Sequence, residues 1–113
     1  MNMKKISWVW QGVPGHFTCA SECRFRLCTR VGKYLVSTVG ELFREDQEGF
    51  QEIGLNRKYE TMVFGDLLKC NCGCGYSIPG NFSEIDFSGY NSSIDAQKGH
   101  MKMCKKYERL QQK

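Results

Sequence analysis

The sequence predicts a small α+β fold, in which an antiparallel sheet is followed by a zinc knuckle and a C-terminal helix. Three observations support this class. Segments with alternating apolar residues occur within 25–43 and 58–64, cysteines and glycines cluster at 70–75, and apolar residues recur at helical spacing near the end. With 113 residues the chain fits one domain. We expect 1–68 to be mainly β structure and 69–113 to hold the knuckle and the helix.

The first strand is expected at 6–10, where strand-forming residues precede a Val-Pro-Gly turn. Strands at 25–31 and 34–43 follow, joined by Gly32 and Lys33 as a two-residue hairpin loop, because glycine readily adopts positive φ. Alternation suggests that one face of this hairpin carries Phe25, Leu27 and Thr29 together with Leu35, Ser37 and Val39.

A further strand is expected at 58–64, where apolar and polar residues again alternate. The acidic stretch before it, 44–56, contains two glycines and is typical of a solvated surface loop. The polar stretch 81–93 supplies turn residues and few periodic apolar ones. We therefore expect irregular structure between the cysteine cluster and the helix.

The last element is predicted to be a helix capped by Ser92 or Ser93, with apolar residues recurring at Met103, Tyr107 and Leu110. Gly99 lies inside it, although glycine costs a helix about 1 kcal/mol relative to alanine. Something other than helix propensity must therefore favour this turn.

His100 and Cys104 are four residues apart, so both side chains project from one face of the helix. Cys72 and Cys74 are each followed by glycine, which lets the backbone curl around a metal ion. Zinc prefers four nitrogen and sulfur ligands, and a closed set is typical of structural sites. The sequence thus predicts one zinc ion bound by Cys72, Cys74, His100 and Cys104. Cys70 with Cys74 is the alternative knuckle pair, and buried free cysteines with a surface histidine are the non-metal alternative.

A second group, His16, Cys19, Cys23 and Cys28, leaves two further hypotheses open. It could form a second metal site, or Cys23 and His16 could form a nucleophile and base, which usually needs a third, orienting group. Against both, Cys28 falls within an apolar strand, and free cysteine is often a small buried hydrophobe. No phosphate loop, zinc-protease motif or serine elbow is present, so enzyme activity is not the default expectation.

The cysteine count of seven is odd, and the N-terminal segment has no apolar leader, which favours metal ligation in a reducing cytoplasm over disulfides. No apolar run is long enough to span a bilayer. The net charge of +4 is segregated, with residues 1–35 at +5, 36–66 at −4 and 67–113 at +3. Such segregation is compatible with nucleic-acid binding, and also with ordinary solvated surface and internal ion pairs.

Several strings together carry a resemblance: GHFTCASECRFRLCTRVGKYLVSTVGE, IGLNRKYETMVF and CGCG…EIDFSGYN…GHMKMC. They resemble a family of small hypothetical proteins encoded by bacteriophages and prophages. The resemblance covers most of the chain and implies a phage accessory protein made in the bacterial cytoplasm, with the knuckle and His-x3-Cys recurring as a unit. It implies no particular activity.

Two functions follow as hypotheses. The first is a zinc-stabilised phage protein that binds a host macromolecule, most simply a host protein, and serves counter-defence or host takeover by protein–protein interaction. The alternative is a nucleic-acid-binding zinc protein, suggested by basic residues in two regions of the chain. These residues are Arg24, Arg26, Arg30, Lys98, Lys102, Lys105 and Lys106. Trp8, Trp10, Tyr34 and Tyr59 could stack on bases or anchor a partner, but aromatic residues at strand spacing are more often core.

Overall fold

A computed structural model describes residues 5–11, 22–43, 48–53, 56–69, 75–81 and 83–112. A five-stranded antiparallel sheet has the order β1-β2-β3-β4-β7, and β5 and β6 form a separate hairpin. The helix α1 (Ser93–Gln111) follows β7, so the predicted α+β class is confirmed. The strands are β1 (Trp8–Gln11), β2 (Cys23–Val31), β3 (Tyr34–Leu42), β4 (Tyr59–Phe64), β5 (Leu67–Lys69), β6 (Ser77–Pro79) and β7 (Asp86–Tyr90).

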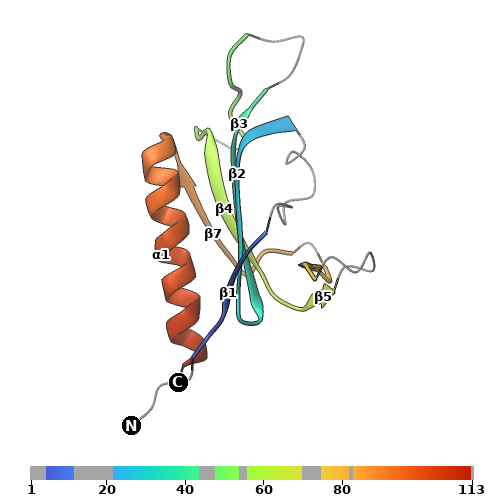
Figure 1. The fold of residues 1–113 in the computed structure, drawn as a ribbon. Coiled ribbons are helices and arrows are strands. Elements are labelled where there is room, and N and C mark those ends of the chain that lie inside the picture. Colours follow the sequence, from blue (N-terminus) through green and yellow to red (C-terminus); the bar gives the residue numbers. More distant parts are fainter. Residues whose placement is uncertain are drawn as a thin grey trace.

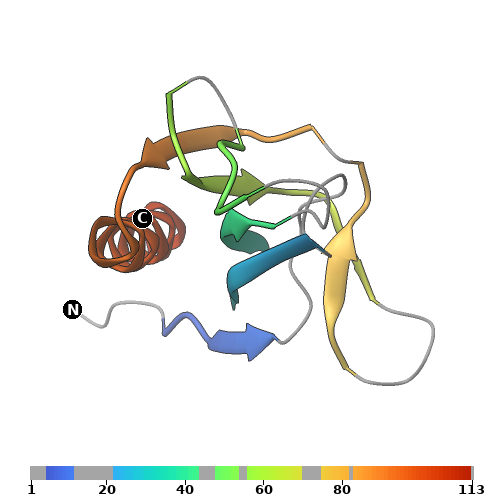
Figure 2. The same ribbon diagram turned by 90° about the horizontal axis from the view of Figure 1, so that it is seen from above.

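The sheet curves around α1, and the β5–β6 hairpin lies against the opposite face (Figures 1 and 2). Val36 and Val63 pack with the helix in the main core cluster. Their neighbours Leu35 and Phe64 point the other way, as alternation in a strand requires, and pack with Leu67 of β5. The molecule thus has three layers, with the helix on one side of the sheet and the hairpin on the other.

The β2–β3 hairpin turns at Gly32 and Lys33, as predicted, and Gly32 has a φ of +60°. This two-residue loop pairs Val31 with Tyr34 and therefore Thr29 with Val36. The predicted face is therefore wrong for all three residues of β2, because this loop pairs odd-numbered residues of β2 with even-numbered residues of β3, for example Phe25 with Gly40 and Leu27 with Thr38. Thr29 instead faces the helix beside Val36.

The helix begins where the sequence predicts. The Ser92 side chain accepts a hydrogen bond from the Asp95 N–H at 3.1 Å, which satisfies one of the free donors of the first turn. The face turned toward the sheet consists of Ala96, His100, Met103, Cys104 and Tyr107. Leu110, expected on this face, is 47% exposed. Among the described residues, no helix is both long and apolar enough for a bilayer crossing.

Strand β7 was not predicted, because its sequence Asp-Phe-Ser-Gly-Tyr reads as turn residues. It pairs antiparallel with β4, from Tyr59 opposite Tyr90 to Val63 opposite Asp86. The part of the chain after the cysteines therefore supplies both an edge strand and the helix that covers the sheet. The two expected parts of the domain share one core.

Part of the acidic stretch 44–56 is anchored to the sheet. The Gln51 N–H donates to the Leu42 carbonyl at 2.7 Å, and Ile53 packs against the small cluster of Cys23, Val39 and Leu42. Residues 44–47 and 54–55 lie outside the described residues. The described part is thus not a free surface loop.

Candidate binding groove

His100 and Cys104 lie on one face of α1, as predicted, and that face is buried against the sheet. Both residues are 0% exposed. The His100 Nε2 lies 2.9 Å from the Thr29 hydroxyl oxygen, and its Nδ1 lies 2.7 Å from that of Thr38. The Thr38 hydroxyl in turn lies 2.6 Å from that of Thr61. A chain of polar groups therefore crosses the centre of an otherwise apolar layer.

Burial sets the protonation state of this pair. Desolvation lowers the pKa of His100 from 6.5 to about 4. Desolvation also raises the pKa of the Cys104 thiol to about 12, although a Thr29 hydrogen bond opposes that shift. His100 is thus a neutral imidazole at neutral pH, with one ring nitrogen donating and the other accepting, and Cys104 is a thiol.

The other two predicted zinc ligands, Cys72 and Cys74, and the alternative Cys70, lie outside the described residues. The strands on either side of them, β5 and β6, lie on the face of the sheet opposite α1 (Figure 2). His100 could reach a zinc ion only by giving up one of its threonine partners. Within the part of the chain that the structure describes, no group of three histidine, cysteine or acidic side chains could hold a metal. The four-residue zinc site stays a prediction, which elemental analysis of protein purified without added metal would test.

The N-terminal cysteine group is only partly described. Cys23 and Cys28 are 3% and 2% exposed, and Cys28 packs with Leu35 and Phe64. This packing agrees with the prediction that Cys28 is a small buried residue within an apolar strand. His16 and Cys19 lie outside the described residues, so the second metal site and the Cys23–His16 pair also stay predictions.

A groove runs between the edge strand β7 and the helix α1. Its volume of about 770 Å³ lies in the range of small-ligand and peptide pockets. The floor and one wall come from β7, and the other wall comes from successive turns of the helix. The lining residues are Asp86, Phe87, Ser88, Gly89, Tyr90, Asn91, Asp95, Lys98, Gly99, Lys102, Met103 and Lys106.

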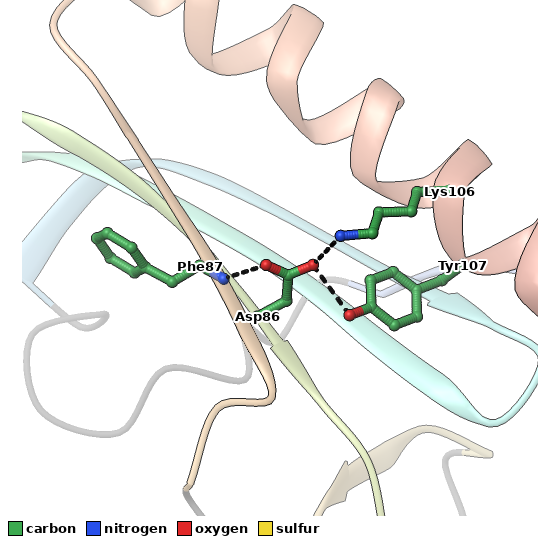
Figure 3. Close-up of polar contacts among 4 residues, drawn as sticks. All are labelled: Asp86, Phe87, Lys106 and Tyr107. Carbon is green, nitrogen blue, oxygen red and sulfur yellow. Dashed lines mark hydrogen bonds and ion pairs between the residues drawn. The ribbon is translucent and has the colours of Figure 1, made fainter.

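Asp86, at the start of β7, lines the groove and contacts Lys106 and Tyr107 of the helix (Figure 3). Its carboxylate accepts hydrogen bonds from the Tyr107 hydroxyl at 3.0 Å, from the Lys106 ammonium and from the Phe87 N–H. Burial by itself would raise the pKa of Asp86, but these donors outweigh it and lower the pKa. The hydrogen bonds link the start of β7 to the last part of the helix.

Toward the N-terminal end of the helix, the spacing is set by Tyr90 and Gly99. A Cβ on Gly99 would overlap the ring of Tyr90, so the ring packs directly on the helix backbone. This contact explains the glycine inside the helix: the close approach of β7 requires it. Two contacts, one at each end of β7, therefore hold the walls of the groove at a fixed separation.

Replacing Gly99 with alanine is expected to destabilise the protein by about 1–3 kcal/mol, because overpacking against Tyr90 outweighs the gain of about 1 kcal/mol in helix propensity. Urea denaturation measures the change. In a Tyr90→Ala background the overlap is gone, so the same substitution should stabilise. A stabilising effect in both backgrounds would contradict the packing.

Two lysines in the groove are available to a ligand. Lys98, Lys102 and Lys106 recur every four residues and line the same wall. Lys106 is paired with Asp86, whereas Lys98 and Lys102 are exposed and form no ion pair with any described residue. Lys105, grouped with them from the sequence, does not line the groove.

The outer edge of β7 is the second open feature of the groove. On its inner edge β7 pairs with β4, and no strand in the described ranges pairs with its outer edge. An edge strand presents backbone N–H and C=O groups to which another chain can add. The spacing of the lysines could be seen in the sequence. The groove could not be predicted, because its floor is β7, a strand that the sequence does not predict.

Comparisons of the chain with protein-family models, with curated proteins and with solved structures find no match.

Proposed function

We propose that this chain is a small phage-encoded accessory protein that binds a host protein, and that the groove between β7 and α1 is its binding surface. The observation that carries the proposal is the outer edge of β7, which pairs with no described strand, beside a wall with two lysines that form no ion pair with any described residue. Backbone groups at a strand edge give affinity for an extended chain, and the lysines add selectivity by charge. The sequence resemblance alone supports the phage origin in this proposal.

The described groove is suited to binding. Its lining contains no histidine or cysteine, and the buried His100 and Cys104 face away from it into the core. A structural zinc ion at the predicted knuckle would stabilise the chain elsewhere. Binding in the groove does not depend on it.

Nucleic-acid binding, the second candidate, draws on the same lysines. One feature of the groove disfavours it. The ring of Tyr90 is packed on Gly99 and is not free to stack on a base. A host protein is therefore the preferred partner.

The test is affinity capture from a bacterial lysate with the parent protein and with a Lys98→Glu/Lys102→Glu variant. The parent should retain a stoichiometric protein partner, and the variant should lose it. A matched control is Lys33→Glu/Lys69→Glu, which changes the net charge equally at exposed positions outside the groove. The control should retain the partner.

Thermal unfolding of the three proteins should agree within a few degrees, since surface substitutions usually change stability by less than about 0.5 kcal/mol. Retention of the same partner by all three proteins would reject the groove as the binding surface. If the parent retained only DNA or RNA, the nucleic-acid alternative would replace the proposal.

A further inference from the structure

We infer that the groove binds an extended acidic segment, which adds as a strand to the outer edge of β7 with alternate carboxylates directed toward Lys98 and Lys102. This inference rests on the proposed function and names the chemistry of the ligand. It is carried by the strand edge, the spacing of the lysines and the apolar side chains on the opposite face of β7.

Strand addition fits the dimensions of the groove. An added strand would lie about 4.8 Å from β7 and run beside the helix. The two ends of the groove are fixed by Asp86 and Tyr90, four residues apart and so separated by roughly 13 Å. A peptide segment of about four or five residues would therefore span it.

The lysines match the repeat of such a strand. Lys98 and Lys102 are four residues apart on α1 and thus about 6 Å apart along the helix axis. Side chains on one face of a strand recur every second residue, or about 6.8 Å. Successive carboxylates on the helix-facing side can therefore each meet one lysine, which favours a Glu-x-Glu or Asp-x-Asp pattern over adjacent acidic residues.

The other face of the added strand would meet apolar surface. Phe87 points away from the helix (Figure 3) and is 39% exposed, with the Arg57 guanidinium 4.4 Å from its ring centroid. Ile85, just before β7, is 53% exposed. The residues between the carboxylates should therefore be apolar, so the predicted ligand alternates acidic and apolar residues.

The experiment titrates the isotope-labelled full chain with a short blocked peptide that alternates glutamate and valine, at low salt. Chemical-shift changes should concentrate on the amides of β7 and on Lys98 and Lys102. The Lys98→Glu/Lys102→Glu variant should bind at least tenfold more weakly, whereas Lys33→Glu/Lys69→Glu should bind within about twofold of the parent.

Two comparison peptides separate strand addition from simple charge attraction. The first carries N-methyl groups on alternate backbone nitrogens of the edge that faces β7, so it keeps every charge but cannot complete the ladder. Loss of two hydrogen bonds should weaken it by about tenfold. The second has the same composition with its glutamates adjacent, and it too should bind more weakly than the alternating peptide.

The inference would be overturned by equal affinity for the N-methylated peptide, by shifts located away from β7, or by tight retention of single-stranded oligothymidine with no competition by the acidic peptide. A concentration-dependent dimer whose interface includes β7 would also overturn it. If the alternating peptide does not bind but the Lys98→Glu/Lys102→Glu variant still loses its host partner, only the ligand chemistry is wrong. If that variant keeps the partner, the proposed function itself fails.

Discussion

Replacing His100 with alanine is expected to lower the free energy of unfolding by about 3–5 kcal/mol, a large part of the roughly 5–15 kcal/mol that stabilises a typical domain. The imidazole is fully buried, and both ring nitrogens are hydrogen bonded to threonine hydroxyls. Its removal leaves a cavity and takes a partner from both Thr29 and Thr38. Urea denaturation followed by circular dichroism gives the change.

Two variants show whether the loss arises from the polar chain. Gln97→Ala on the exposed side of α1 should change stability by less than about 0.5 kcal/mol. A triple substitution, Thr29→Val, Thr38→Val and His100→Leu, removes both sides of each histidine hydrogen bond, which can be nearly neutral. It should recover part of the loss, since the buried Thr61 hydroxyl still loses its contact with Thr38. A His100→Ala variant as stable as Gln97→Ala would contradict the buried geometry.

Acidification is expected to destabilise the parent by roughly 3 kcal/mol between pH 7 and pH 4 through His100 alone. Burial lowers the pKa of this imidazole from 6.5 to about 4 in the folded protein. The unfolded chain therefore binds more protons than the folded chain across this window. The contribution is fully present above pH 6.5 and is lost as the pH falls toward the folded pKa.

The pH effect is measured by urea denaturation at several pH values, with the parent and the triple variant compared at each. Asp86, whose pKa is also lowered, titrates in both proteins and cancels in the difference. The difference should be constant above pH 7 and should shrink as the pH falls to 4. A difference that does not change with pH would mean that His100 is solvated or charged in the folded state.

The central sheet and the helix could be predicted because local chemistry specifies them. A glycine at the β2–β3 turn, strand-forming residues in β4 and a serine cap before α1 act over a few residues, and the structure contains all three elements. Strand β7 could not be predicted, because its polar sequence becomes a strand only through pairing with β4. Tertiary context overrides propensity at such a strand.

The residues of the candidate site could likewise be predicted only in part. The helical spacing of His100 and Cys104 predicted correctly that they share a face, but not that Thr29 and Thr38 would satisfy both ring nitrogens of the histidine. Those contacts join residues more than sixty positions apart, and no local pattern reports them. Gly99 gave the clearest local signal, since an unfavourable residue in a helix pointed to a close contact, which proved to be Tyr90.

The buried polar chain also determines where along the sheet the helix can dock. Apolar contacts alone would let the helix slide along the sheet, because apolar side chains can pack against one hydrophobic surface nearly as well as against another. The hydrogen bonds to the Thr29 and Thr38 hydroxyls do not tolerate sliding. A shift of the helix by one turn would place Ala96 or Cys104 where His100 now lies. Sliding in either direction would leave buried donors and acceptors unmatched, so the sheet accepts the helix in a single register. That register in turn places Lys98 and Lys102 beside β7.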